Sequence, residues 1–453
     1  MSVERNGGLL RQVTRRTATL LVVANIIGAG IFTTTGFQAA DIGHPLVILG
    51  LWLLGGVIAL CGALAYGELG AAMPSAGGEY VYLRHTYGGV FGFMSAFVSL
   101  VAGFSAPIAS VVKGLVGYLA AYAPALADGP ASGLVGLGDL AAIGIVWLLV
   151  AIQLAGAGSG FRLVDWVTLT KVGGIVAIVA AAVLVGRGRL AGLVTPAPQF
   201  AEMGAADVAT GVATSLIFVM FCYSGWNAAA YIAGELRDPE HDLPRSLLAG
   251  TGIVVVLYLA INAVYFYGAP VEELAGRVEV GLISGRRLFG EVGGVLVTAV
   301  LCTSLLGSAA AMTVAGPRVS YALGRDYRAF GLLARTGRGG GVPVAALLLQ
   351  GLVTSAIILS GRIDQIMQYA GFTLTLFASL AVSCVVTLRI RRPEMRRPFH
   401  CWGYPWTPLF FLAASAWMML WAVRGRPAES LLSVLTVAVG GLLFYLTGRR
   451  GAG

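Results

Sequence analysis

Charged residues are scarce in this sequence. They make up 11% of the 453 residues, whereas 57% of the residues are hydrophobic and the mean hydropathy is +0.84. A soluble domain carries about 25% charged residues, so a chain of this length with so few charges lacks the polar surface that water-soluble domains need. We therefore expect a membrane protein without a large soluble domain.

Metal-binding, disulfide and catalytic patterns are also missing. The five cysteines are scattered, without metal-ligand spacing and without an even set in loops, so we expect neither a zinc site nor a disulfide framework. The four histidines lie near the ends of apolar runs rather than together, and no acid–base group assembles around them. These absences argue against an enzyme, and we expect no cofactor.

Lysine is nearly absent, because 28 of the 30 basic residues are arginine and only Lys113 and Lys171 are lysine. The arginines occur in short connections between apolar runs, where membrane orientation and anionic lipid explain them better than nucleic acid does. With residues 1–16 as a cytoplasmic tail that has no cleavable signal, 20 arginines fall on the inner side and 8 on the outer side. This excess predicts a multi-pass protein of the cell membrane with both termini in the cytoplasm.

Twelve apolar runs are present, each near or above the roughly 20 residues that a membrane-spanning helix needs. They lie near 17–39, 45–70, 88–120, 135–157, 163–186, 208–235, 244–268, 290–324, 342–361, 365–390, 405–424 and 429–448. The predicted fold class is therefore an all-α polytopic membrane protein with twelve transmembrane helices.

Two of these runs contain residues that interrupt helices. The first contains Gly28-Ala29-Gly30, and the sixth contains Phe221-Cys222-Tyr223-Ser224-Gly225-Trp226-Asn227. Glycine costs about 1 kcal/mol relative to alanine inside a helix, and Ser and Asn compete for backbone hydrogen bonds. Taken alone, such glycines can simply allow close helix packing. At comparable places in two groups of spans, they favour helices that open.

The positions of the two interruptions indicate an inverted repeat. Residues 17–187 and 208–390 each hold five spans, and each group begins with an interrupted one. Because five is odd, the second group enters the membrane from the opposite side, which is typical of secondary transporters. Residues 405–448 then supply two additional C-terminal helices.

Opened helices present free N–H groups and free carbonyls, which together match a zwitterion. We expect the N–H groups of residues 29–31 to bind an α-carboxylate, and the carbonyls of Ile27, Phe221 and Cys222 to bind an α-ammonium. Phe221 and Trp226 are either gating aromatics or lipid-facing ones. The candidate substrate-binding residues are Ile27, Gly28, Ala29, Gly30, Ile31, Phe221, Cys222, Ser224, Trp226 and Asn227.

The two lysines receive different predictions. Lys171 lies well inside the fifth run, where a charge costs about 2.5 kcal/mol or more and usually faces an interior cavity. We predict a coupling role for Lys171, with snorkelling to the inner surface as the alternative. Lys113 lies nearer the outer end of the third run, and we expect its side chain to snorkel outward. No acidic residue lies in the middle of the first, third, sixth, eighth or tenth span, so a neutral substrate side chain is favoured.

Several motifs occur in a fixed order along the chain. They are IIGAGIF at 26–32, PSAGGEYVYL at 74–83, ELRDP at 235–239 and GPRVSYALGRD at 316–326. Together they resemble the amino acid–polyamine–organocation (APC) superfamily, and the sixth-span stretch at 221–227 is most similar to the L-type amino-acid transporter branch and its bacterial relatives.

The resemblance implies a five-plus-five inverted repeat of the leucine-transporter type, with discontinuous helices 1 and 6 and alternating access. It implies that the Lys171 ammonium stands where sodium sits in sodium-coupled relatives. It also places Ser308 near that lysine, although a hydroxyl bonded back to its own helix is equally open. The outer connection 121–133 lacks the cysteine that tethers animal members of this branch to a heavy subunit, so we expect no heavy-chain partner.

The expected function is sodium-independent secondary transport of amino acids, most simply neutral L-amino acids, by exchange or by proton-linked uptake. One alternative is a proton-coupled permease for cationic amino acids or polyamines. A channel or a receptor-like membrane protein is the alternative from another class, but the spans show no repeated polar rings for a pore. The expected partners are the amino acid, membrane lipid and protons, and nucleic acid is not among them.

Overall fold

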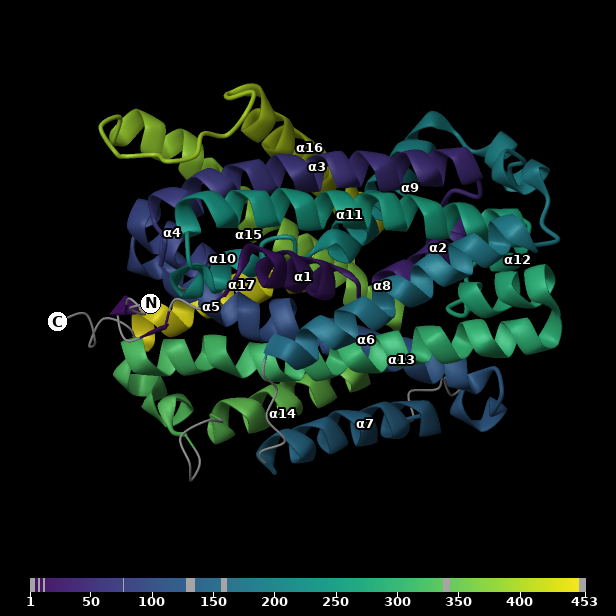
Figure 1. Cartoon of the computed structure of the whole chain (residues 1–453), viewed down its shortest axis with the longest axis horizontal. Coiled ribbons are helices and arrows are strands. Elements are labelled where there is room, and N and C mark those ends of the chain that lie inside the picture. The colour runs from purple at the N-terminus through teal and green to yellow at the C-terminus, as the bar shows by residue number, and fades with distance from the viewer. Residues whose placement is uncertain are drawn as a thin grey trace.

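The computed structural model describes residues 5–6, 9–10, 13–75, 77–127, 135–155, 161–336 and 343–447, with side chains described from Val13 onward except at 161–167. This part of the chain is nearly all helical, and its long helices run side by side along the horizontal direction of Figure 1. The strands β1 (Arg5–Asn6) and β2 (Leu9–Leu10) form one short antiparallel pair.

The helices of the first half of the chain are α1 (Arg15–Ile26), α2 (Gly30–Asp41), α3 (Pro45–Ala72), α4 (Glu79–Tyr87), α5 (Gly89–Val98), the π-helix η1 (Ser99–Ser105), α6 (Ala106–Ala120), η2 (Pro124–Leu126), α7 (Leu137–Leu154), α8 (Phe161–Leu184), η3 (Leu190–Leu193), η4 (Pro198–Glu202) and α9 (Ala205–Tyr223). Those of the second half are α10 (Ala228–Tyr231), η5 (Ala233–Glu235), α11 (Pro239–Gly268), α12 (Val271–Leu274), α13 (Val280–Asp326), η6 (Arg328–Ala334), α14 (Val344–Ser360), α15 (Ile363–Arg391), α16 (Trp406–Gly425) and α17 (Pro427–Thr447).

Within the described residues, ten helical segments are long and apolar enough to cross a membrane. The fifth and ninth predicted spans correspond to α8 and α14, whose apolar stretches, Thr168–Leu184 and Val344–Ser360, are shorter. The all-α architecture is therefore as predicted. The count of twelve spans and the five-plus-five repeat stay predictions.

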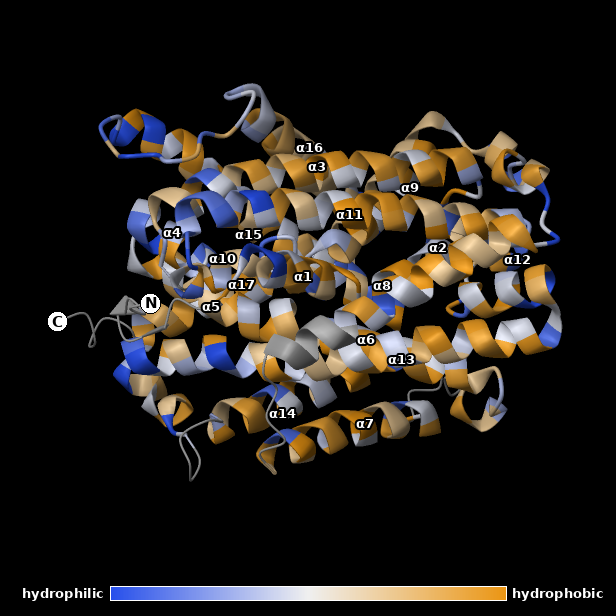
Figure 2. Cartoon of the chain, viewed as in Figure 1, coloured by the Kyte–Doolittle hydropathy of each residue, from blue (hydrophilic) through white to orange (hydrophobic). Residues whose placement is uncertain are grey.

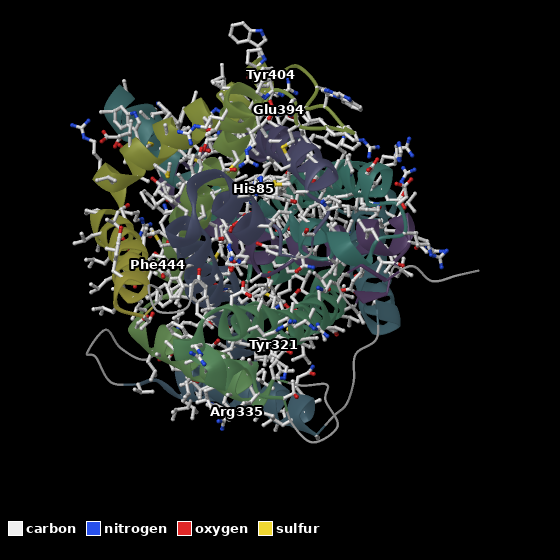
Figure 3. All side chains as sticks on the ribbon, turned by 90° about the vertical axis from the view of Figure 1, so that its left-hand side faces the viewer. His85, Tyr321, Arg335, Glu394, Tyr404 and Phe444 are labelled. Carbon is white, nitrogen blue, oxygen red and sulfur yellow. The ribbon has the colours of Figure 1, made fainter. Side chains whose placement is uncertain are left out.

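Hydrophilic residues gather at the ends of the helix bundle. Figure 2 shows mainly hydrophobic colours along the middle of the bundle and a concentration of hydrophilic ones at the end where α4 lies. Figure 3 looks onto that end, which we call the α4 end. The residues labelled there come from widely separated segments, namely His85, Tyr321, Arg335, Glu394, Tyr404 and Phe444.

Both predicted helix interruptions are present. Residues 27–29 separate α1 from α2, and residues 224–227 separate α9 from α10. Gly225 has φ of 98°, a left-handed conformation that favours glycine. A Cβ added to Gly225 would lie 2.8 Å from the carbonyl carbon of Asn25. The second break therefore packs directly against the backbone that precedes the first.

Two other spans are less regular than predicted. The predicted eighth span, 290–324, is part of the longer helix α13, which changes direction at Gly290, where φ is 75°. The third span contains the π-helix η1, which lies directly before α6. Pro107, in the first turn of α6, cannot donate to the helical ladder, so a local change of hydrogen-bond pattern at this place costs little.

The interrupted helices lie in the core of the bundle, whereas α16 and α17 lie at its edge. In the apolar window of the segment formed by α1 and α2, 78% of residues are buried, against 28% for α16 and 17% for α17. α1 and α3 both pack along α11. Opened backbone in a membrane protein is tolerated only inside such a core or beside a cavity, and this is where both breaks are found.

Candidate functional site

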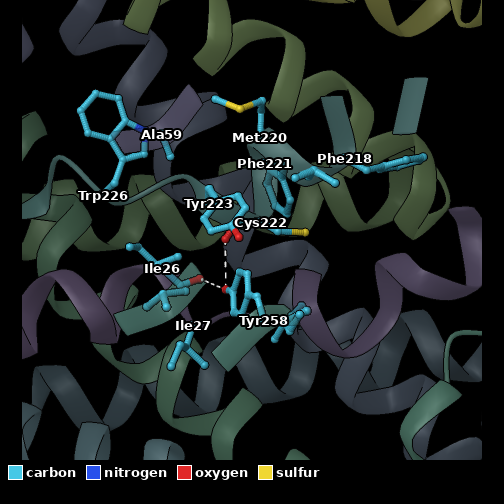
Figure 4. Packing of buried hydrophobic residues seen from close by; sticks show 14 of the residues in the cluster. Ile26, Ile27, Ala59, Phe218, Met220, Phe221, Cys222, Tyr223, Trp226 and Tyr258 are labelled. Carbon is cyan, nitrogen blue, oxygen red and sulfur yellow. Dashed lines mark hydrogen bonds between the residues drawn. The ribbon is translucent and has the colours of Figure 1, made fainter. Parts of the chain in front are cut away.

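The two helix breaks are joined by one tyrosine. The Tyr258 hydroxyl on α11 lies 2.7 Å from the carbonyl oxygen of Ile26 and 3.1 Å from that of Cys222. Figure 4 shows this hydroxyl between the two broken helices. A buried tyrosine needs a partner for its hydroxyl, but the sequence contains 16 tyrosines and carries no signal that singles out this one. Sequence reasoning therefore missed Tyr258.

Lys171 reaches the first break from α8. Its side chain is only 1% exposed, and its Nζ lies 2.7 Å from the Ser308 hydroxyl and 3.3 Å from the carbonyl oxygen of Ile27. The Ile27 carbonyl is at the C-terminal end of α1, where the helix dipole favours a positive charge. The alternative that Lys171 snorkels to the inner surface is therefore wrong.

Ser308 makes both of the contacts that the sequence left open. Its Oγ accepts from Lys171 and lies 3.0 Å from the carbonyl oxygens of both Ile27 and Ser304. The single hydroxyl proton is donated to one of these two carbonyls. The hydroxyl thus links α8, α13 and the first break.

The carbonyls predicted for an α-ammonium already have donors within the protein. The Ile27 carbonyl faces Lys171 and Ser308, and the Cys222 carbonyl faces Tyr258. The Phe221 carbonyl accepts from Ser224, whose Oγ lies 2.6 Å away. An incoming ammonium would have to replace one of these donors in the conformation seen here.

In contrast to these carbonyls, the backbone N–H groups at the start of α2 have no hydrogen-bond partner among the described residues. Within the described residues, no backbone carbonyl accepts a hydrogen bond from the N–H groups of residues 29–31, whereas the Gly28 N–H donates to the Tyr258 hydroxyl. A Cβ added to Gly28 would find its nearest neighbours, Ile26 O and Met312 Cε, 4.0 Å away, so a methyl group would fit beside this residue. A helix N-terminus with unpaired N–H groups is suited to an anionic group such as a carboxylate.

Gly30 has a packing role rather than an open surface. A Cβ added to Gly30 would lie 2.3 Å from the Cys222 Sγ. The same sulfur lies 3.1 Å from the Thr34 hydroxyl. The close approach at Gly30 is therefore made by α9, whereas a methyl group would fit beside Gly28.

The aromatic candidates are buried inside the bundle. Trp226 is 3% exposed, and its ring meets Tyr66 at a centroid distance of 4.5 Å. Phe221 is 6% exposed and lies close to Gly371 of α15, where an added Cβ would be 3.1 Å from the Phe221 Cβ. The lipid-facing alternative is wrong for both residues.

Asn227 faces away from the first break. Its side-chain nitrogen donates to Glu79 Oε1 at 2.7 Å. The structure thus brings together residues 27–31, 221–224, Lys171 and Ser308. It places Trp226 and Asn227 on the side of α3 and α4. Glu79 is the first residue of α4, and only the tertiary arrangement reveals its contact with the second break.

The prediction for Lys113 is wrong. Its Nζ lies 2.6 Å from Asp139 Oδ1, and the two side chains are 8% and 19% exposed. Asp139 is in the first turn of α7, and the packing of α6 beside α7 brings it within reach. An amine in the membrane gains more from a close carboxylate than from a reach to the surface.

The described residues contain no group of three His, Cys, Asp or Glu side chains that could hold a metal ion. The polar groups described beside the first break are backbone dipoles, hydroxyls, the Cys222 thiol and the Lys171 ammonium. Such a set can bind and orient a small charged solute.

Comparison with known proteins gives matches along nearly the whole chain. Residues 14–443 match the family model described as amino acid permease. The serine/threonine exchanger SteT of Bacillus subtilis (strain 168) is 27% identical over 455 residues, covering 100% of both chains. The human large neutral amino acids transporter small subunit 2 is 24% identical over 427 residues, 94% of this chain and 78% of that protein. The human cystine/glutamate transporter is 26% identical over 415 residues, 92% of this chain and 80% of that protein.

All three relatives are amino acid transporters or exchangers, which supports amino acid transport by a multi-pass membrane protein. The resemblance to the APC superfamily is thereby confirmed. Since the family match begins before the first broken helix and ends within the last helix, the chain belongs to the amino acid permease family.

Proposed function

We propose that the protein is a sodium-independent secondary transporter of neutral L-amino acids that works by alternating access, with exchange as its mode. The observation that carries this proposal is the position of the Lys171 ammonium, 3.3 Å from the Ile27 carbonyl and 2.7 Å from Ser308. In transporters with broken helices, unwound carbonyls and half-helix C-terminal ends coordinate the coupling cation. A built-in ammonium at such a place removes the need for sodium.

In this proposal the substrate carboxylate binds the free N–H groups at the start of α2, beside Gly28. Gly28, Ala29, Gly30 and Ile31 supply the backbone, and Ile27, Phe221 and Cys222 shape the ammonium side. Ser224, Trp226 and Asn227 support the second break. Lys171 and Ser308 act as the coupling pair.

Two features favour a neutral substrate and exchange. The residues that surround the breaks offer hydroxyl, thiol and apolar groups, and the buried carboxylate of Glu79 already accepts two hydrogen bonds. Two of the relatives are named for serine and threonine exchange and for large neutral amino acids. A buried ammonium that keeps its proton is a fixed charge, which favours exchange over proton-linked uptake.

Transport into liposomes tests the proposal. Labelled serine, threonine and leucine are offered to vesicles that are empty or preloaded with unlabelled amino acid, with and without sodium and a pH gradient. Uptake that requires preloading and ignores sodium is the expected result. Uptake that depends on sodium would contradict the proposal. Uptake of lysine or putrescine driven only by a pH gradient would favour the cationic permease, and a current that does not saturate with substrate would favour a channel.

We further propose that the protein lies in the cell membrane with both termini in the cytoplasm and acts without a heavy-chain partner. The arginine distribution supports this orientation. The connection 121–133, on which the partner prediction depends, is only partly described, because residues 128–133 lie outside the described residues.

A further inference from the structure

Helix α4 begins with a buried carboxylate that holds two other segments. Glu79 is 7% exposed, and its Oε1 accepts from the Tyr66 hydroxyl at 2.5 Å and from the Asn227 side-chain amide at 2.7 Å. Tyr66 belongs to α3, and Asn227 is the last residue of the second helix break. One oxygen atom thus joins three segments of the chain.

The rest of α4 is attached to different helices. The Tyr80 hydroxyl donates to Asp326 at the end of α13, and Arg84 lies 3.3 Å from the same carboxylate. The Tyr87 hydroxyl lies 2.7 Å from the Ser383 hydroxyl and 2.9 Å from that of Thr387 on α15. Helix α4 is therefore fixed to α13 and α15 independently of Glu79.

The second break is held against α3 at the same place. The Trp226 ring packs edge-on against Tyr66, and a Cβ added to Gly62 of α3 would lie 2.8 Å from the Trp226 ring. Burial raises the pKa of the Glu79 carboxyl, and its bonds to Tyr66 and Asn227 oppose that shift. Both donors therefore favour the ionised form of the Glu79 carboxyl, and the loss of either weakens the whole contact.

We propose that Glu79 is a positioning residue that, through Asn227, holds α10 and the second break against α3 and α4 and so keeps the α4 end of the candidate site closed. The contact breaks when the site opens toward that end. The inference rests on the proposed function, because alternating access requires such an opening. α4 itself stays attached to α13 and α15, so the opening is a movement of the second break away from it.

The native cysteines supply a reporter. Cys222 lies at the second break, is 3% exposed and is the thiol that opening would reach. Cys384 on α15 is also buried, and its Sγ lies 3.8 Å from the Tyr82 carbonyl of α4. A general loosening of α4 would expose Cys384, whereas the proposed movement exposes Cys222 alone.

The experiment measures the rate of maleimide labelling at each cysteine of the full-length purified protein by mass spectrometry. Glu79→Ala is expected to raise the Cys222 rate by about ten-fold, because hydrogen bonds to charged groups are of that strength. Tyr66→Phe is expected to act in the same direction but less strongly, since it removes one donor. Glu79→Gln keeps an acceptor oxygen but loses the charge, so its Cys222 rate is expected to lie between those of wild type and Glu79→Ala. Tyr87→Phe, which removes a hydroxyl from the other end of α4, is the matched control and is expected to leave Cys222 unchanged.

Three results would overturn the proposal. The first is an unchanged labelling rate of Cys222 in folded Glu79→Ala. The second is a rise of the Cys384 rate in Glu79→Ala that parallels the rise at Cys222. The third is a Cys222 rate in Glu79→Gln or in Tyr87→Phe that is as high as in Glu79→Ala. Labelling needs no substrate, so this outcome is separate from that of the transport assay. If the labelling pattern holds but liposomes exchange no amino acid, the proposed function fails and the positioning role of Glu79 stands.

Discussion

Lys171 and Ser308 are 137 positions apart in the sequence, yet their Nζ and Oγ atoms lie 2.7 Å apart. This contact brings α8 and α13 together beside the first helix break, where both side chains face the Ile27 carbonyl. The two partners of this ammonium among the described residues are neutral oxygens, so its burial is costly unless the surrounding dipoles favour it. The end of α1 supplies those dipoles.

Substitution of Lys171 should therefore lower the exchange rate strongly while changing the stability of the protein little. Lys171→Ala is expected to lower the exchange rate by about ten-fold to one hundred-fold, the effect of losing a charged hydrogen bond. The melting temperature should change little or rise, because a buried charge is removed. Exchange in liposomes and thermal unfolding of the same preparation measure the two effects. Wild-type exchange by a folded Lys171→Ala protein would rule out the coupling role.

Substitution of Lys113 should have the opposite effect. Lys113→Gln leaves Asp139 as a half-buried carboxylate without its ammonium, so we expect a loss of about 1–3 kcal/mol in stability. The exchange rate per folded molecule should stay near the wild-type value. The double variant Lys113→Gln with Asp139→Asn should recover most of the lost melting temperature, because neither partner is then charged. Equal melting temperatures for wild type and Lys113→Gln would show that the pair contributes nothing.

The two glycines beside the first break should respond differently to alanine. Gly28→Ala adds a methyl group where the nearest atoms are 4.0 Å away, so the protein should fold normally while the methyl group takes space beside the free N–H groups. We expect a rise of about ten-fold in the KM for exchange, equivalent to about 1.4 kcal/mol of binding energy. An unchanged KM would place the substrate carboxylate elsewhere.

Gly30→Ala serves as the contrasting variant. Its methyl group would lie 2.3 Å from the Cys222 Sγ, so we expect overpacking that costs about 1–3 kcal/mol in stability. Adding Cys222→Ala removes that sulfur and should restore part of the melting temperature. If the double variant is no more stable than Gly30→Ala, the contact between α2 and α9 does not explain the requirement for glycine.

Loss of the Tyr258 hydroxyl should weaken the link between the two breaks. Tyr258→Phe leaves the Ile26 and Cys222 carbonyls without this donor, so we expect a loss of about 1–3 kcal/mol in stability. Tyr265→Phe is a matched control on α11, because the Tyr265 hydroxyl is buried and has no hydrogen-bond partner within the described residues. Its removal should be neutral or slightly stabilising. Thermal unfolding of both variants measures these two changes in stability. An equal loss of stability in Tyr258→Phe and Tyr265→Phe would show that the Tyr258 hydroxyl does not link the breaks.

The helix breaks could be predicted because their causes are local. Glycine, serine and asparagine weaken a helix through their own backbone preferences, so Gly28, Gly30 and the stretch 221–227 stand out within apolar runs. The left-handed φ at Gly225 is one expression of the same preference. The unusual position of Lys171 could also be predicted, because an isolated charge in an apolar run is recognised from the sequence without knowledge of its partner.

The partners of these residues could not be predicted, because they come from helices far away in the sequence. Lys113 contacts Asp139 because α6 packs beside α7. Asn227 contacts Glu79 because the second break packs beside α4. Hydropathy reports whether each segment prefers lipid, and this preference depends on composition alone. A hydrogen bond depends on distances of about 3 Å between particular atoms. Membrane insertion, the helix interruptions and the exceptional position of Lys171 therefore follow from the sequence alone. The direction of each buried polar side chain was decided by how the helices pack.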